Sequence, residues 1–123
     1  FKSTHGGAKM SECLFCKMVS GKIPCNQVFE NESILAFRDI APKAPTHILV
    51  IPKKHIESIN ALDRNDKELA GEMLLVAQQI TRDEGIDETG FRAVFNTNTH
   101  GGQTVFHIHM HLFGGRQMTW PPG

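Results

Sequence analysis

The sequence lacks an excess of charge of either sign, because 13 lysines and arginines are matched by 13 aspartates and glutamates among its 123 residues. This balance argues against broad, unspecific binding to nucleic acid or to anionic membranes, although it leaves room for a local basic pocket. Long apolar runs are also missing, since the longest, residues 73–77, is far shorter than the roughly 20 residues that span a bilayer. We therefore expect neither nucleic acid nor a membrane among the partners.

Cysteine is scarce as well, with three residues in the chain. An odd number of thiols in a chain long enough to bury its own core favours free or metal-bound cysteines over disulfides. Such cysteines are typical of a reducing compartment, so we expect a cytoplasmic protein.

The length and the absence of an internal repeat predict one domain. Residues 1–9 read FKSTHGGAK, a polar, glycine-rich stretch without the apolar core of a secretory signal. We interpret them as a vector-derived or disordered segment ahead of a natural start at Met10, and we assign residues 10–123 to the domain. Residues 114–123 should form an irregular tail, because Trp120 is followed by two prolines.

Apolar spacing and turn residues predict an α+β domain. A short helix is expected over residues 12–19 with Ser11 as its N-cap, and a long helix over residues 64–84, between Asp63 and Gly85. Five β-prone runs bounded by turn residues lie at residues 27–30, 34–38, 46–51, 91–97 and 104–113. They predict a five-stranded, mostly antiparallel sheet with the long helix packed on it, and a loop over residues 98–103.

Histidines alternate with apolar residues in the last of these runs, which reads VFHIHMHLF from residue 105. Because strand side chains alternate between faces, His107, His109 and His111 are expected on one face, looking into a cleft. The opposite face is then an apolar strip in the core, formed by Phe106, Ile108, Met110 and Leu112.

Three interpretations of these histidines compete. Hydrogen bonding to neighbours or water would explain one imidazole better than three in strict alternation. A single metal would bind at most two of them, because the first and third lie roughly 13 Å apart on a strand and a zinc–nitrogen bond is about 2.1 Å. Neighbouring imidazoles, roughly 6.6 Å apart, suit different oxygens of one phosphorus centre. We favour this third interpretation.

The residues just before the histidines support a phosphate site. Gly101 and Gly102 offer backbone N–H groups, Gln103 an amide and Thr104 a hydroxyl, all of which can hold phosphate oxygens. A plain hairpin turn is the alternative explanation of the two glycines.

The heptapeptide at residues 107–113, His-Ile-His-Met-His-Leu-Phe, resembles the histidine-triad signature. Further likeness at residues 37–55, at residues 101–103 and at residues 114–123 resembles the histidine-triad nucleotide-binding (Hint) branch of that superfamily. The resemblance covers essentially residues 11–123. It implies a homodimer with one ten-stranded sheet, and hydrolysis of adenosine 5′-phosphoramidates and aminoacyl adenylates to AMP.

The resemblance also assigns catalytic roles by position. His109 would be the nucleophile that takes the adenylyl group, and His111 would contact the phosphate and help with proton transfer. His107 would support His109, with His47 close by. Thr104 stands where the family usually has a serine, so its added methyl group restricts the leaving-group side. Attack by an imidazole exchanges one P–N bond for another and needs no metal or other cofactor.

A nucleotide site is implied in the same way. The apolar slot for the purine would be formed by Phe15, Met18, Phe37 and Ile40, and the ribose hydroxyls would be held by the Asp39 carboxylate. The phosphate would be contacted by Asn96, Gly102, Gln103, Thr104, His109 and His111. The tail aromatic that reaches toward the partner's site would be Trp120. Read without the resemblance, Asp39 begins a turn, Phe37 is plain core and Asn96 satisfies the edge of a loop.

The pair Cys13 and Cys16 lies three residues apart on the first helix, so both thiols share a face. Some histidine-triad relatives, including galactose-1-phosphate uridylyltransferases, add two histidines to such a pair, and the matching positions here are His55 and His107. The resemblance thus allows a structural zinc ion beside the site. Alternatively the thiols are simply small buried or surface side chains. Cys25 has no evident partner.

Together these inferences predict a purine nucleoside phosphoramidase that acts on AMP derivatives through an adenylyl-His109 intermediate. The nearest enzymatic alternative is a dinucleoside polyphosphate hydrolase with the same nucleophile, which the glycine loop and the short tryptophan tail disfavour. An alternative of another class is a zinc-containing purine-nucleotide binding module that interacts with other proteins.

Overall fold

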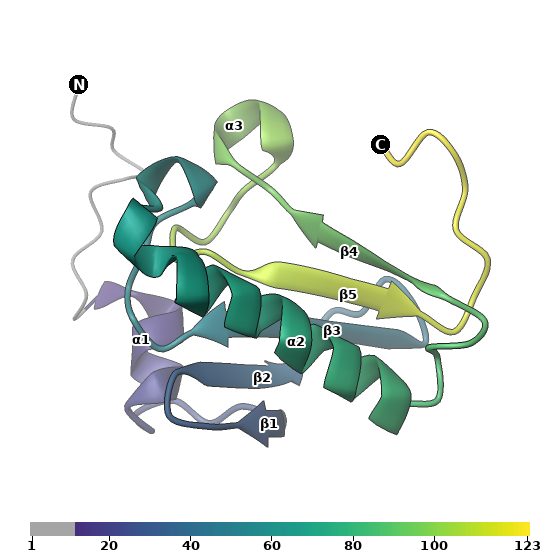
Figure 1. Cartoon of the computed structure of the whole chain (residues 1–123), viewed down its shortest axis with the longest axis horizontal. Helices are drawn as coiled ribbons and strands as arrows, with labels where there is room; N and C mark the ends of the chain where they lie inside the picture. The colour runs from purple at the N-terminus through teal and green to yellow at the C-terminus, as the bar shows by residue number, and fades with distance from the viewer. Residues whose placement is uncertain (1–11) are drawn as a thin grey trace.

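The computed structural model describes residues 12–123, so the expectations for residues 1–9 and for Ser11 lie outside the described residues. The strands are β1 (Gln27–Glu30), β2 (Ile34–Arg38), β3 (Thr46–Pro52), β4 (Phe91–Phe95) and β5 (Met110–Gly114). They form one sheet in the order β1-β2-β3-β5-β4, and every neighbouring pair is antiparallel (Figure 1). The predicted α+β class and five-stranded sheet are confirmed.

The short N-terminal helix begins later than predicted. Helix α1 (Leu14–Val19) starts after Cys13, whose Sγ accepts the Cys16 N–H at 3.4 Å and so caps the first turn. The predicted loop over residues 98–103 contains a four-residue helix, α3 (Asn98–Gly101).

The long helix is present, but its first predicted turn has a different geometry. Arg64–Asp66 forms a 3-10 turn, because the Asp63 and Asp66 side chains cap each other's backbone N–H groups, and α2 (Lys67–Asp83) follows. A second 3-10 turn spans Ile59–Ala61. Among the described residues, no helix is both long enough and apolar enough to cross a membrane.

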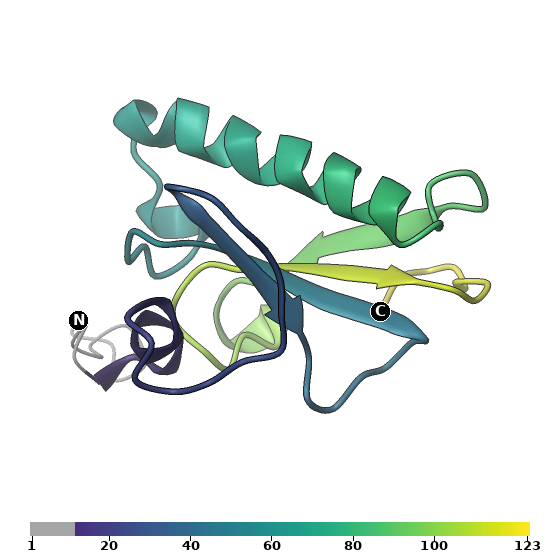
Figure 2. The same ribbon diagram turned by 90° about the horizontal axis from the view of Figure 1, so that it is seen from below.

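The sheet has a core on each face, because successive strand side chains point to opposite sides. Helix α2 lies along one face, and α1 lies near the other (Figure 2). The α2 face buries Ile34, Ala36, Ile48, Val50, Met73, Val76, Ala77, Ile80, Met110 and Leu112. The α1 face buries Cys13, Phe15, Leu35, Phe37, Leu49 and Ile51. The site described below lies on the α1 face.

The last strand is shorter than predicted. β5 begins at Met110, and residues 104–109 are irregular, because Ile108 N–H bonds to Ile56 O at 2.6 Å instead of to a neighbouring strand. Of the expected apolar strip, Ile108, Met110 and Leu112 are buried, whereas Phe106 is half-buried. Strict alternation therefore holds only from Met110 onward.

Candidate functional site

A cavity of about 200 Å³ opens on the α1 face of the sheet. It is mainly apolar at the α1 end, where the rings of Phe15 and Phe37 meet edge to face with centroids 5.4 Å apart. Eight of the predicted site residues line it: Phe15, Met18, Phe37, Asp39, Ile40, Thr104, His109 and His111. The structure thus brings the predicted purine slot, ribose carboxylate and two of the three triad histidines into one cavity.

Four predicted nucleotide contacts do not line this cavity: Asn96, Gly102, Gln103 and Trp120. The Gln103 amide is engaged within the chain, since its Oε1 accepts from Asn98 N–H at 2.9 Å and its Nε2 donates to Glu57 O at 2.7 Å. It therefore shapes the glycine loop. Trp120, on the tail, is 83% exposed.

Hydrogen bonding fixes which nitrogen of His109 carries the proton and which can act as a base. Its Nδ1 donates to the His107 carbonyl oxygen at 2.8 Å, so in the neutral ring Nε2 carries the lone pair. Phe15 meets the ring edge to face, with centroids 5.1 Å apart. Burial lowers the pKa of His109, which keeps the imidazole neutral and nucleophilic.

His111 carries its proton on the other ring nitrogen, Nε2, because of its hydrogen bond with His47. Lys43 backbone N–H donates to His47 Nδ1 at 3.1 Å, so the His47 proton sits on Nε2 and is donated to His111 Nδ1 at 3.0 Å. The proton of neutral His111 is then on Nε2, as a donor. Burial lowers the pKa of both rings, and for His111, with help from His109 and His47, to about 4.

Asp39 forms the turn that its sequence position suggested, and it also lines the cavity. Its Oδ1 accepts Ala41 N–H at 2.8 Å and begins the turn before Pro42, while the carboxylate also lines the cavity. Oδ2 lies 3.6 Å from His47 Nε2.

His107 does not look into the cavity, contrary to the prediction, and is fully buried. Its Nε2 donates to Pro52 O at 2.7 Å, which leaves the Nδ1 lone pair facing Cys13 Sγ at 3.4 Å and Cys16 Sγ at 3.6 Å. The irregular backbone before β5 lets this ring turn away from its neighbours. Burial lowers the pKa of His107 to about 4.

These ring and thiol atoms fit a metal site. Cys13, Cys16, His55 and His107 each offer a ligand atom, all within 4.8 Å of one another, and Cys16 Sγ lies 3.3 Å from His55 Nδ1. A tetrahedral zinc ion with ordinary Zn–S and Zn–N bonds separates sulfur from nitrogen by about 3.5 Å. The Pro52 carbonyl is the kind of outer partner that orients a metal-bound histidine. Burial and the neighbouring Cys13 raise the pKa of Cys16 to about 11, and a bound cation would favour the thiolate.

A second trio, Asp39, His47 and His111, also has ligand atoms within 4.8 Å of one another. Here the hydrogen bonds argue against a metal, because His47 Nδ1 already accepts the Lys43 N–H and its Nε2 must carry the proton. That nitrogen has no lone pair to offer, so this trio is a hydrogen-bonded relay.

Several residues around the cavity were not predicted from the sequence. Leu14 and Val105 line it, as does Cys25, for which no partner was evident. Leu14 shares α1 with Phe15 and Met18, so its helical position is a usable signal. Lys43 acts through its backbone N–H, which no side-chain pattern reveals.

Comparisons with known proteins find relatives of this chain. The family model described as "Scavenger mRNA decapping enzyme C-term binding" matches residues 12–120. The purine nucleoside phosphoramidase of Escherichia coli strain K12 is 47% identical over 107 residues, which cover 87% of this chain and 90% of that protein.

Solved structures are similar as well. A HIT family hydrolase from Legionella pneumophila Philadelphia 1 has a TM-score of 0.89 and 58% identity, covering 90% of this chain and 99% of that one. A histidine triad protein from Clostridium difficile has a TM-score of 0.86 and 38% identity, covering 91% and 96%. The chain therefore belongs to the histidine-triad (HIT) family and is a nucleotide hydrolase of the histidine-triad type.

Proposed function

We propose that this chain hydrolyses adenosine 5′-phosphoramidates and aminoacyl adenylates to AMP through an adenylyl intermediate on His109. The observation that carries the proposal is the bond from His109 Nδ1 to His107 O, because it leaves Nε2 as a nucleophile in a cavity with an aromatic wall. The likeness to a purine nucleoside phosphoramidase supports the same substrate class.

In the proposed reaction, His109 Nε2 attacks the α-phosphorus, the bond from phosphorus to the leaving group breaks, and a phosphorus–nitrogen bond to the ring forms. His111 donates its Nε2 proton as a hydrogen bond to the phosphate and takes part in proton transfer to the leaving group. Water then cleaves the adenylyl-histidine bond, which releases AMP and restores the neutral ring. The Thr104 methyl group narrows the side from which the leaving group departs.

The substrate would lie along the cavity with its base at the α1 end. Phe15, Phe37 and Met18 offer apolar surface to a purine, and Ile40, which is 98% exposed, would be covered by it. Asp39 Oδ2 would accept from the ribose hydroxyls while Oδ1 stays on the Ala41 N–H.

The test uses the parent protein and His109→Ala. Each is mixed with an adenosine phosphoramidate, the reaction is quenched rapidly without acid, and the intact protein is analysed by mass spectrometry. We expect an added adenylyl mass on the parent alone. Neither adduct nor AMP release at saturating substrate would contradict the enzyme and favour a nucleotide-binding module. Faster turnover of diadenosine polyphosphates than of the phosphoramidate would instead indicate the polyphosphate hydrolase. If AMP is released without an adduct, single-turnover timing decides whether hydrolysis outruns adenylylation.

We also propose that Cys13, Cys16, His55 and His107 bind a structural zinc ion. The sulfur–nitrogen distances of 3.3, 3.4 and 3.6 Å support a tetrahedral site, and all three cysteines of the chain are free thiols. Such an ion would link α1 to His55 and His107 and leave His109 free. Free thiols also suit the cytoplasmic location that we propose.

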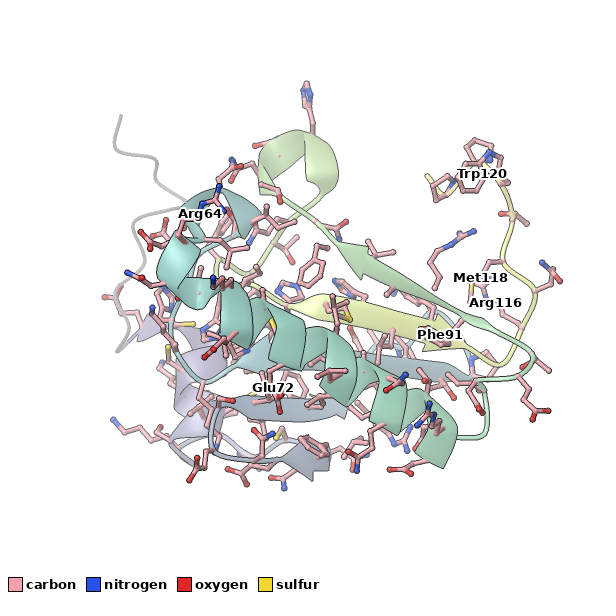
Figure 3. All side chains as sticks on the ribbon, viewed as in Figure 1. Arg64, Glu72, Phe91, Arg116, Met118 and Trp120 are labelled. Carbon is pink, nitrogen blue, oxygen red and sulfur yellow. The ribbon has the colours of Figure 1, made fainter. Side chains whose placement is uncertain are left out.

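We further propose that two copies pair through β4 into a ten-stranded sheet. The sheet has two edge strands, β1 and β4. β1 is poorly suited to pairing with a second copy, because its own pairing with β2 shifts register between Gln27 and Phe29. β4 pairs regularly with β5 and exposes Phe91, which is 40% exposed (Figure 3). Leu74 and Leu75 on α2 are 59% and 62% exposed, and a second copy would cover such apolar surface.

A further inference from the structure

We infer that Arg116, in the C-terminal tail, is a positioning residue that sets the tautomers of His47 and His111 through the backbone of Lys43. The inference rests on the proposed function, because it concerns how His111 presents a proton to the phosphate. Arg116 lies beyond the end of β5, at the surface and outside the cavity (Figure 3).

The tail and the catalytic relay meet at one residue. Arg116 Nε and Nη2 donate to Lys43 O at 3.3 and 3.1 Å, so one edge of the guanidinium gives this carbonyl two hydrogen bonds. The N–H of the same Lys43 donates to His47 Nδ1 at 3.1 Å. Lys43 is thus held at its carbonyl by Arg116 and at its N–H by His47, which restrains the two peptide units that meet at this residue.

A second contact holds the tail close to residues 43–45. Gly115 has a φ of +89°, and a Cβ there would lie 2.9 Å from Pro45 Cβ, so the turn after β5 passes closely over this proline. Arg116 Nη1 also donates to Gln117 O at 3.2 Å, which orients the guanidinium toward Lys43. The tail therefore restrains the segment in both position and direction.

The restraint matters because His47 has two neutral tautomers. With Lys43 N–H in place, His47 Nδ1 must accept and Nε2 donates to His111. If the Lys43 N–H moves away, His47 can carry its proton on Nδ1 and accept at Nε2. His111 must then donate from Nδ1, and its Nε2 turns a lone pair toward the phosphate oxygens. Displacement of one backbone N–H thereby replaces a His111 hydrogen-bond donor with a lone pair that repels the phosphate oxygens.

The experiment compares Arg116→Ala and Arg116→Lys with Gln117→Ala. The control lies next along the same tail, and its side chain donates only to Met118 O among the described residues. Ring ¹⁵N chemical shifts of His47 and His111 report the tautomers without substrate. Steady-state kinetics on an adenosine phosphoramidate give kcat and KM, and thermal unfolding gives the midpoint.

For Arg116→Ala we expect both rings to lose part of their Nε2–H population, because both hydrogen bonds to Lys43 O are lost. The kcat should then be about threefold to tenfold lower. KM should stay within about twofold and the unfolding midpoint should be unchanged, since Arg116 is exposed and does not line the cavity. Arg116→Lys, which keeps the charge without the fork, should fall between Ala and the parent.

Unchanged ring shifts in Arg116→Ala, or an equal change in Gln117→Ala, would overturn the inference. A rise in KM with unchanged kcat would also overturn it, because that pattern indicates substrate binding. Since the ring shifts are read without turnover, failure of the parent protein to cleave the phosphoramidate would contradict the proposed function alone.

Discussion

Single hydrogen bonds decide what each of the alternating histidines can do. His107 gives its Nε2 proton to Pro52 O and points Nδ1 at two thiols, whereas His109 gives its Nδ1 proton to the His107 carbonyl. His111 receives a proton from His47 at Nδ1. Three identical side chains are thus held in three different arrangements, because each ring is fixed by a different partner, and these arrangements suit the metal ligand, the nucleophile and the donor that we propose.

The depressed pKa of His111 predicts how stability depends on pH. Folded His111 has a pKa of about 4, below the value of about 6.5 in an unfolded chain, so the unfolded state binds more protons between these values. The stability that the neutral ring contributes is complete above pH 6.5 and is lost as the pH falls toward 4. After allowance for solvent screening we expect this loss to be about 1–2 kcal/mol.

Urea unfolding followed by circular dichroism, at about pH 7 and about pH 4.5, measures this loss. His111→Asn keeps an acceptor for His47 but does not titrate, so it should lose less stability than the parent over this range. The rings of His109 and His47 and the Asp39 carboxylate face His111 and are present in both proteins. Equal losses in the two proteins would show that His111 titrates normally in the fold.

At the scale of elements, the sequence predicts what local chemistry determines. The β1–β2 turn was predictable because Asn31 Oδ1 accepts the N–H groups of Ser33 and Ile34, which is a local bond of a turn residue. The limits of β5 were not, because the backbone of residue 108 bonds to Ile56, far away in the chain. Alternation therefore placed all three rings on the α1 face, but only His109 and His111 line the cavity there, while His107 faces the cysteines.

The zinc proposal makes a prediction about α1, a helix of six residues that is too short to be stable by itself. The purified protein should contain about one zinc per chain, and Cys16→Ser should lose it. Without the ion α1 loses its tie to His55 and His107, so the unfolding midpoint should fall by about 5–15 °C. Elemental mass spectrometry and thermal unfolding measure the two effects.

Cys25→Ser is the matched control, because Cys25 is a free thiol that belongs to no group of possible metal ligands among the described residues. It should keep its zinc. Retention of the metal by Cys16→Ser, or a parent protein that takes up no zinc in titration, would contradict the proposed ligand set.

At the scale of the whole molecule, the proposed dimer would let a second copy add groups to the cavity of one chain. The cavity is closed at the α1 end by Phe15 and Phe37 but has no tail aromatic, since Trp120 of the same chain is 83% exposed and does not line it. An exposed tryptophan on a tail and an exposed Phe91 on a regular sheet edge have the same explanation in a dimer. Each chain would supply Trp120 to the partner's cavity.

Mixed dimers test whether Trp120 acts in the partner's site. Trp120→Ala should lower kcat/KM about tenfold by removing an aromatic contact to the leaving group, and His109→Ala should be inactive. When the two variants are refolded together, each mixed dimer holds one site with an intact His109 and the partner subunit's Trp120. The kcat/KM per intact site should then return to within about twofold of the parent, whereas His109→Ala mixed with parent calibrates the fraction of mixed dimers. If the mixture keeps the kinetics of Trp120→Ala, the tryptophan acts within its own chain or on neither site, and the arrangement proposed here for the dimer is wrong.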